Sequence, residues 1–172
     1  EKLDDHDVDG VEQDVKRIRA AHDRIEDIVE DVLLLAREGQ TIEETEPIDV
    51  ASVAGRAWAT VESTDATLQL DGTATIEANE SRLRSIFENL FRNAIDHVGP
   101  TVTVTIRFHE DGFAVEDDGP GIPAAEHDQI FEYGYTDSEG GTGLGLSIVR
   151  TMAQAHGWQV SLDPEGEGAR FR

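Results

Sequence analysis

The chain of 172 residues contains no cysteine, and lysine occurs only at Lys2 and Lys16. Without cysteine the chain cannot form a disulfide framework, a thiolate metal site or a thiol nucleophile. No apolar run approaches the roughly 18 residues that a membrane-spanning helix needs, and no secretory leader is visible. We therefore expect a soluble protein of the cytoplasm, in which any membrane association of a longer protein comes from segments outside this sequence.

Basic residues are also scarce, because 14 lysines and arginines stand against 37 acidic residues and leave a net charge of −23. The hydrophobic share of 38% is still enough to bury a core. Repulsion among these charges weakens the compact state at low salt. High salt screens the repulsion, because the Debye length falls to about 3 Å near 1 M salt. The charge indicates a protein adapted to a salt-rich cytoplasm, as in a halophile, and argues against nonspecific nucleic-acid binding.

The first part of the chain has the pattern of one long helix, in which apolar or small side chains, with His22 as the one polar member, recur in steps of four and three. This heptad seam consists of Val11, Val15, Ile18, His22, Ile25, Val29, Val32 and Ala36. A heptad seam packs against a partner helix, and no later segment of the chain repeats it. We therefore expect the partner in another chain or in a segment missing from this one.

A second part begins at Pro47 and alternates helical and strand patterns. The expected elements are, in order, a helix over 48–60, strands over 67–70 and 74–78 joined by an Asp71-Gly72 turn, a helix over 80–97, strands over 101–108 and 113–117, a helix over 143–156 and a hairpin over 158–172. A loop rich in Gly, Asp and Ser occupies 118–142. This alternation predicts a two-layer α/β sandwich, with helices on one face of a mixed sheet.

A glycine cluster, GGTGLGLSIV, runs from Gly140 to Val149 and leads directly into the last helical pattern. No lysine lies near it, which excludes a P-loop, and a loop rather than a strand precedes it, which excludes a Rossmann turn. The free N–H groups and the positive dipole end of a helix start suit a phosphate. Taken alone, the cluster fits a phosphate site or a simple flexible hinge.

Asn89, Asn93 and His97 are spaced by four residues, so they form one stripe along the edge of the apolar face of the helix over 80–97. Two aligned amide oxygens can chelate a hard cation. The alternative is that these are ordinary solvated helix residues, although asparagine is a poor helix former.

The stretch VEDDGPGIP ends a predicted strand with Asp117 and then turns through Gly119 and Gly121. A carboxylate at a strand end can accept a hydrogen bond from an exocyclic amine, and glycines let the backbone approach a flat ring. The alternative is a simple acidic turn.

Together and in this order, these motifs resemble those of the catalytic, ATP-binding domain of sensor histidine kinases, within the ATPase group of DNA gyrase B, Hsp90 and MutL. NLFRNA resembles the N box, DDGPGI the first glycine box, IFEYGYT the phenylalanine box, GTGLGLSIV the second glycine box and GEGARF, more weakly, the last glycine box. The resemblance implies a Bergerat-type ATP-binding fold over 47–172. It also implies that 1–40 hold part of the dimerisation and histidine-phosphotransfer hairpin.

The resemblance implies a site for ATP and Mg²⁺. Asp117 would bind the adenine amino group, and Gly119, Gly121 and Ile122 would form the wall of the base pocket. Asn93 and Asn89 would hold Mg²⁺. The remaining nucleotide-binding residues would be His97 beside them, Phe131 as the anchor of a mobile lid, and Gly141, Thr142, Gly143, Leu144, Gly145 and Leu146 around the phosphates.

The activity implied is that of a protein histidine kinase, a transferase that donates the γ-phosphoryl of ATP to a histidine on a dimerisation hairpin. Its partners would be ATP and ADP, the dimerisation helices of a homodimer and the receiver domain of a response regulator in a two-component phosphorelay. A hydrolytic ATPase of the gyrase or Hsp90 type is an alternative, but Asn89 stands where those relatives carry a proton-accepting glutamate. A degenerate, nucleotide-dependent interaction module is a second alternative.

Two features depart from the family pattern. The phosphoacceptor box is absent: His22 precedes Asp23, but it lies in the heptad seam and no proline follows, so we expect a truncated or processed fragment. Asp96 occupies a position that is often basic, and the lid over 123–141 contains no lysine or arginine. The resemblance therefore does not imply tight ATP binding.

Overall fold

The computed structural model describes residues 44–61, 65–110, 112–136, 142–164, 166 and 168–172. It also describes five single positions, Val15, His22, Ile25, Val29 and Leu33. At these five positions the backbone is helical and the side chains are exposed. The other residues of the predicted heptad helix lie outside the described residues, so its seam stays a prediction.

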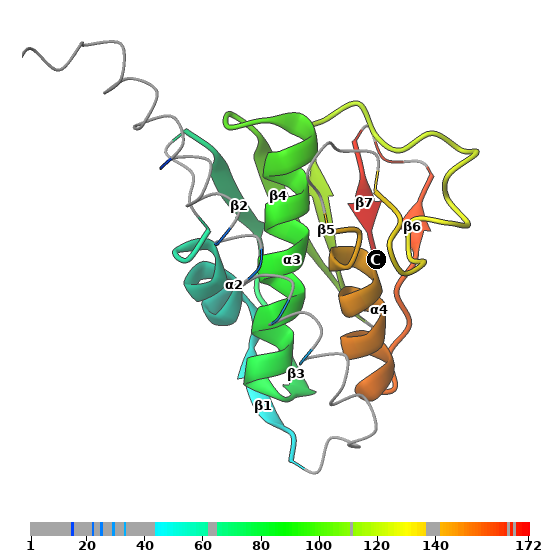
Figure 1. Ribbon diagram of the computed structural model, residues 1–172. Helices are drawn as coiled ribbons and strands as arrows, with labels where there is room; N and C mark the ends of the chain where they lie inside the picture. Colours follow the sequence, from blue (N-terminus) through cyan, green and yellow to red (C-terminus); the bar gives the residue numbers. More distant parts are fainter. Residues whose placement is uncertain are drawn as a thin grey trace, which may run out of the picture.

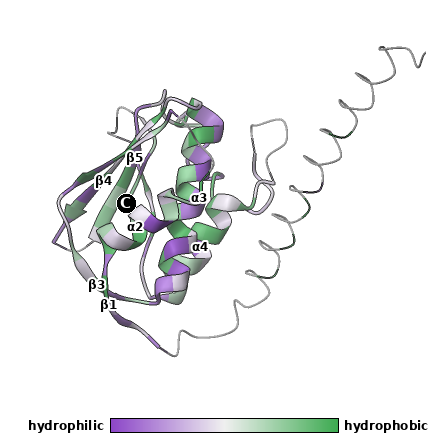
Figure 2. Cartoon of the chain, turned by 90° about the vertical axis from the view of Figure 1, so that its left-hand side faces the viewer, coloured by the Kyte–Doolittle hydropathy of each residue, from purple (hydrophilic) through white to green (hydrophobic). Residues whose placement is uncertain are grey.

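The described residues after 44 form two layers, with α2, α3 and α4 on one face of a five-stranded sheet (Figures 1 and 2). The elements are β1 (Glu46–Asp49), α2 (Val50–Trp58), β2 (Thr67–Asp71), β3 (Thr75–Ala78), α3 (Glu80–Val98), β4 (Thr103–His109), β5 (Gly112–Asp117), α4 (Gly145–Ala155), β6 (Leu162–Asp163) and β7 (Arg170–Phe171). The predicted two-layer sandwich is confirmed.

The five-stranded sheet has the order β2-β4-β5-β7-β6 and is mixed, because β2 runs parallel to β4 and the other neighbours are antiparallel. The predicted hairpins β4–β5 and β6–β7 are both present. The strands predicted over 67–70 and 74–78 are present as β2 and β3, but they do not pair with each other, since β3 pairs with β1 in a separate two-stranded sheet. The chain does turn at Gly72, where φ is 108°, but a turn fixes only a change of direction and not the partner of each strand.

The predicted helix over 48–60 begins later, at Val50, because residues 46–49 form the unexpected strand β1. Asp49 ends that strand and caps the helix, its carboxylate accepting a hydrogen bond of 3.2 Å from the Ala51 N–H. The helix α4 likewise begins at Gly145, two residues after the predicted start.

The helix α3 is the centre of the core and has the predicted bounds to within one residue. Asn79 caps its start by accepting a hydrogen bond of 3.1 Å from the Arg82 N–H, and Gly99 ends it with φ of 118°. Its buried face packs against α2 and the sheet, with ring centroids 5.0 Å apart for Trp58 and Phe91. Among the described helices, none is both long and apolar enough to cross a lipid bilayer.

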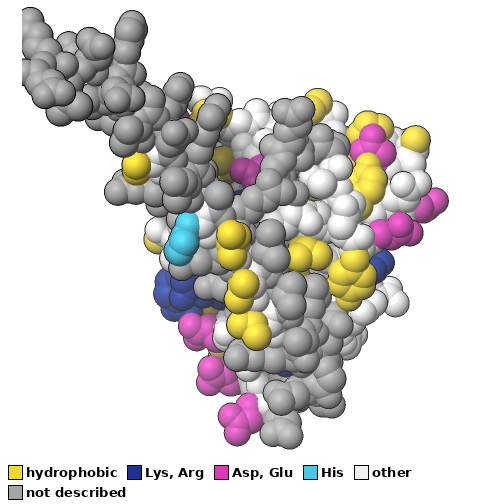
Figure 3. Space-filling view, viewed as in Figure 1, with side chains coloured by type: hydrophobic (Ala, Val, Ile, Leu, Met, Phe, Trp, Pro, Cys, Tyr) yellow, Lys and Arg dark blue, Asp and Glu magenta, His cyan; other side chains and the backbone are white. Residues whose placement is uncertain are grey.

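The surface carries the acidic excess in dispersed form. On the face shown in Figure 3, acidic side chains occur in several separate places around the margin, and hydrophobic side chains lie between them. Arginines on the sheet offset some of this charge, since Glu116 accepts hydrogen bonds from Arg170 at 2.8 Å and from Arg107 at 3.0 Å. These pairs lower the pKa of Glu116, mainly through the Arg170 hydrogen bond.

Candidate functional site

The site lies where the C-terminal half of α3 meets the start of α4. The two helices pack against each other, and Gly145 at the start of α4 faces the amide side chains of α3. A Cβ atom on Gly145 would lie 3.1 Å from Asn93 Oδ1 and 3.3 Å from Asn89 Oδ1. The structure thus brings the two predicted amide ligands close to Gly145 of the second glycine box.

The two asparagines differ in how they are held. Asn89 is buried, with 8% of its surface exposed, and its Nδ2 donates a hydrogen bond of 2.9 Å to the Ser85 carbonyl. This bond orients the amide so that its oxygen faces Gly145. Asn93 is half-buried, whereas His97 is exposed in the last turn of α3. Two amide oxygens that converge in this way suit a hard cation such as Mg²⁺.

Asp117 lies at the end of β5, and its Oδ1 accepts hydrogen bonds from the Gly119 N–H at 2.9 Å and the Ala169 N–H at 3.2 Å. No residue in the described part of the chain donates a hydrogen bond to its Oδ2, so that oxygen is free to accept from a ligand. Burial raises the pKa of Asp117, the two backbone hydrogen bonds oppose that rise, and the charges of Asp118 and Glu116 add to it.

Glycines surround this carboxyl because there is no room for a side chain. A Cβ atom on Gly119 would lie 2.9 Å from Asp117 Oδ1 and would overlap Val98. A Cβ atom on Gly168 would overlap the Asp117 carbonyl. Gly121 has φ of 74°, which favours glycine, and Ile122 after it packs partly buried against the core.

The sequence motifs did not assign a role to Gly168 or Ala169. Gly168 lets the last hairpin approach the end of β5, and Ala169 donates its backbone N–H to Asp117. A signal for Gly168 was present, because it lies in the GEGARF stretch that resembles the last glycine box. The donor role of Ala169 cannot be recognised from the sequence, because its backbone N–H is the same in every residue except proline.

The start of α4 presents backbone donors without a side-chain cap. Leu144 is the N-cap residue, and its side chain caps nothing, while the Ser147 hydroxyl donates to the Leu144 carbonyl at 2.7 Å. The Leu144 N–H is engaged, at 3.3 Å, by the Thr142 hydroxyl. The first N–H groups of a helix have no partner within it, so those of Gly145 and Leu146 suit an anion.

The lid is closed at its base by two glycines. The Gly134 N–H donates a hydrogen bond of 2.9 Å to the Gly143 carbonyl, and Gly143 has φ of 69°. Before this closure, Phe131 packs edge-on against Phe171 of β7, with ring centroids 6.2 Å apart. Residues 137–141, including the predicted phosphate-binding Gly141, lie outside the described residues.

Glu88 precedes Asn89 in sequence, but its carboxylate is held by Arg84 of α3 and by Thr60 in the turn after α2. Its Oε1 accepts hydrogen bonds from Arg84 Nε at 2.7 Å and from the Thr60 hydroxyl at 3.0 Å. The carboxylate is therefore committed to a structural contact away from the Asn89 amide.

Comparison with known proteins gives the family. A family profile described as "Histidine kinase-, DNA gyrase B-, and HSP90-like ATPase" matches residues 78–172. The chain belongs to this family. The match spans α3, β5, the lid and α4, so it contains every motif on which the resemblance was based.

The relatives of this ATPase-family chain include sensor proteins and sensor histidine kinases. Sensor protein CutS of Streptomyces coelicolor is 37% identical over 174 residues, covering 91% of this chain and 42% of CutS. Sensor histidine kinase CpxA of Escherichia coli is 29% identical over 182 residues, covering 94% of this chain and 39% of CpxA. The chain therefore spans about two fifths of the length of these relatives.

Solved structures agree with the family and with the fold. The mycobacterial sensor histidine kinase MprB matches with a TM-score of 0.65 and 26% identity, covering 74% of this chain and 94% of that one. Full-length ShkA in complex with AMPPNP matches with a TM-score of 0.73 and 29% identity, covering 99% of this chain and 39% of ShkA. The mixed sheet with helices on one face is the histidine kinase ATP-binding fold.

Proposed function

We propose that this chain is the ATP-binding catalytic part of a two-component sensor histidine kinase. The observation that carries the proposal is the convergence of Asn89 Oδ1 and Asn93 Oδ1 at the start of α4. An oxygen pair beside free helix-start N–H groups is an arrangement for a phosphate chain and its cation. The similarity to sensor protein CutS and to sensor histidine kinase CpxA supports the same assignment.

The adenine end of ATP would lie at Asp117. Its Oδ1 is already held by two backbone donors, so Oδ2 would accept the hydrogen bond from the exocyclic amine. Gly119, Gly121 and Ile122 would line the ring, and Phe131 would hold the lid near it. Guanine presents a carbonyl where adenine presents an amine, so the site would select adenine.

The phosphate end would lie against the N–H groups of Gly145 and Leu146 at the start of α4, with Thr142, Gly143 and Leu144 leading into it. Asn89 and Asn93 would hold Mg²⁺, which when bound would neutralise phosphate charge. Asn89 is an amide and cannot take a proton from water, and the Glu88 carboxylate is held by Arg84 and Thr60. These residues favour keeping ATP intact until a better nucleophile arrives.

That nucleophile would be a histidine on a dimerisation hairpin, and a response regulator would receive the phosphoryl group next. We assign residues 1–40 to part of this hairpin and residues 47–172 to the catalytic domain. Exposed apolar side chains on helical backbone support a partner helix at the first part, since Ile25 is 60% exposed and Val29 50%.

The test is calorimetry of Mg²⁺-ATP binding to the unmodified chain, to Asn93→Ala and to Gln154→Ala. Gln154 is an exposed amide on α4 outside the site and serves as the matched control. We expect Asn93→Ala to abolish the Mg²⁺-dependent part of the affinity and Gln154→Ala to leave it unchanged. Unchanged Mg²⁺-ATP affinity in a folded Asn93→Ala protein would contradict the assignment.

A further inference from the structure

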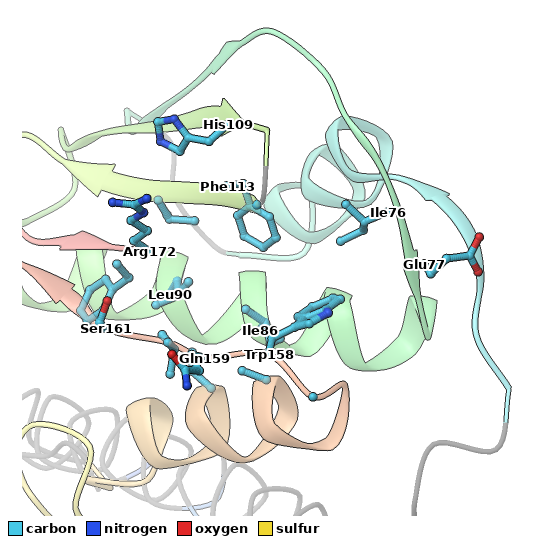
Figure 4. A pocket seen from close by; sticks show the side chains of 17 residues that line it. Ile76, Glu77, Ile86, Leu90, His109, Phe113, Trp158, Gln159, Ser161 and Arg172 are labelled. Carbon is cyan, nitrogen blue, oxygen red and sulfur yellow. The ribbon is translucent and has the colours of Figure 1, made fainter.

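The five-stranded sheet has one face toward the helices and one face away from them, and the two faces differ in chemistry. The Phe113 ring lies between β5 and α3, as Figure 4 shows, with its centroid 5.2 Å from that of Phe87, and Val115 belongs to the same core. Successive side chains of a strand point to opposite faces, so Glu116 of β5 lies on the outer face, away from the helices. That outer face carries a row of charged side chains.

Five charges of alternating sign cross the outer face, one on each strand of the sheet. In the order of the strands, this charge row consists of Asp71, Arg107, Glu116, Arg170 and Asp163. Arg107 of β4 bonds to Asp71 at 3.1 Å and to Glu116 at 3.0 Å. Arg170 of β7 bonds to Glu116 at 2.8 Å and to Asp163 at 3.3 Å. Each arginine therefore joins its own strand to both neighbouring strands.

The link between Arg170 and Glu116 is the part of the charge row that is best protected from water. The exposed fraction of the side chain is 12% for Glu116 and 25% for Arg170, against 46% for Arg107 and 68% for Asp71. Salt screens a partly buried pair much less than an exposed one. The Arg170 hydrogen bond is also the largest cause that lowers the pKa of Glu116. High salt therefore weakens this link less than the outer link to Asp71.

This link lies directly beside the carboxylate of the proposed adenine site. Glu116 and Arg170 are cross-strand partners in the pairing of β5 with β7. Asp117 follows Glu116 in sequence, and Ala169 precedes Arg170. The Ala169 N–H donates to Asp117 Oδ1 at 3.2 Å, and the Asp117 N–H donates to the Ala169 carbonyl at 3.1 Å. The ion pair on the outer face therefore holds together the two strand ends that orient this carboxylate.

The strand ends approach so closely here that a change in their separation would act on Asp117 directly. A Cβ atom on Gly168 would overlap the Asp117 carbonyl. Ala169 contributes only a methyl group to the core. Arg170 is thus the first residue of this segment whose side chain bonds to β5.

We propose that Arg170 is a positioning residue for adenine, which acts through Glu116 to keep the Ala169 N–H on Asp117 Oδ1 and so keeps Oδ2 aimed at the exocyclic amine. Arg170 does not touch the nucleotide, because Glu116 and Asp117 are adjacent on the strand and point to opposite faces. When this hold is lost, the carboxylate turns and its hydrogen bond to the amine weakens. The inference rests on the proposed ATP site and adds the residue that sets how strictly the site selects adenine.

The test is calorimetry of the full chain with ADP and with purine riboside diphosphate, whose ring lacks the exocyclic amine. The ratio of the two affinities measures what the amine contributes, whereas a general loosening of the fold lowers both affinities alike and leaves the ratio unchanged. We expect a ratio of at least about tenfold in the unmodified chain and of less than about threefold in Arg170→Leu.

Arg107→Leu is the matched control, because Arg107 also pairs with Glu116 on the outer face but lies on β4, across β5 from β7. We expect it to keep the ratio of the unmodified chain. Glu116→Gln is a second variant that keeps the size of the side chain and removes its charge, and it should also lower the ratio, by about threefold. Thermal melting verifies that each variant is folded at the assay temperature.

The outcomes separate this inference from the proposed function. A ratio that keeps its unmodified value in Arg170→Leu, or in Glu116→Gln if Arg170→Leu does not fold, overturns the inference and leaves the adenine role of Asp117 intact. An equal fall in Arg107→Leu overturns it as well, because any break in the charge row would then have the same effect. A ratio of one in the unmodified chain overturns the adenine role itself, and the inference with it.

Discussion

Gly145→Ala separates stability from nucleotide binding. Alanine is the better helix former, by up to about 1 kcal/mol in a helix interior and less in the first turn, so we expect α4 to be no less stable. The new Cβ atom, however, would lie 3.1 Å from Asn93 Oδ1 and 3.3 Å from Asn89 Oδ1. These contacts are tighter than ordinary van der Waals distance, so the amide oxygens must move by a few tenths of an ångström.

A displacement of a few tenths of an ångström has little effect on the stability of the fold but a large effect on the geometry of a cation site. Since a misplacement of about 1 Å can cost roughly 100-fold in a catalytic arrangement, we expect Mg²⁺-ATP affinity to fall by about three- to tenfold. Urea denaturation measures the free energy of unfolding, and calorimetry with and without Mg²⁺ measures the affinity. The magnesium-free affinity for ATP should change less than the magnesium-dependent one.

Gly55→Ala is the matched control, because Gly55 lies in α2 and a Cβ atom there would meet nothing within 4 Å. It should raise the free energy of unfolding by roughly 0.5–1 kcal/mol and leave nucleotide affinity unchanged. If Gly145→Ala binds Mg²⁺-ATP as tightly as the unmodified chain, the two asparagines do not hold the cation against α4.

Three further predictions concern Asp117, His156 and salt. Asp117→Asn should not lower the free energy of unfolding at pH 7, because burial raises the pKa of this carboxyl and makes its charged form costly. The affinity for ADP should nevertheless fall by at least about tenfold. Equal affinity of the unmodified chain for ADP and GDP would count against the adenine role. His156 accepts a hydrogen bond at Nε2 from the Asn79 N–H at 3.0 Å and donates from Nδ1 to the Met152 carbonyl at 2.7 Å. Burial lowers the pKa of His156, the Met152 hydrogen bond opposes this, and the Arg82 charge adds to it. The contribution of neutral His156 to stability should therefore be present above about pH 6.5 and be lost as the pH falls below it. If the melting temperature of His156→Gln depends on pH in the same way as that of the unmodified chain, this prediction is refuted. The melting temperature should rise steadily from about 0.1 M to 2 M potassium chloride, because the shortening Debye length screens the repulsion among the 37 acidic side chains. A melting temperature that stays flat or falls would remove the halophile interpretation.

Local signals predicted the elements of the fold better than their pairing. The apolar spacing predicted the bounds of α3 to within one residue, and in the structure these bounds are fixed by Asn79 and Gly99, which act within one turn. The parallel pairing of β2 with β4 could not be predicted, since it joins strands separated by β3 and the whole of α3. The strand β1 was missed because residues 48 and 49 were assigned to the helix after Pro47, whereas Pro47 pairs with Glu77 in a short two-stranded sheet.

For the site, too, local features could be predicted from the sequence and long-range contacts could not. The types and spacing of Asn89, Asn93 and Asp117 were visible in the sequence, because the roles proposed for these residues belong to their side chains. Their relation to Gly145 was not visible, because it depends on how α3 crosses α4. The Ala169 donor lies 52 residues from Asp117, and any residue except proline supplies the same N–H group.

Phosphoryl transfer tests the central claim most directly. The chain is incubated with Mg²⁺ and ATP labelled at the γ-phosphate, either alone or with a separate dimerisation hairpin that contains a His-Asp/Glu box, and phosphohistidine is recognised as label that is lost in acid and kept in base. We predict label on the added hairpin and none on the chain by itself, with the Asn93→Ala chain inactive as a donor. Label on His22 of the chain alone, or a hairpin that stays unlabelled while Mg²⁺-ATP binds, would contradict the account.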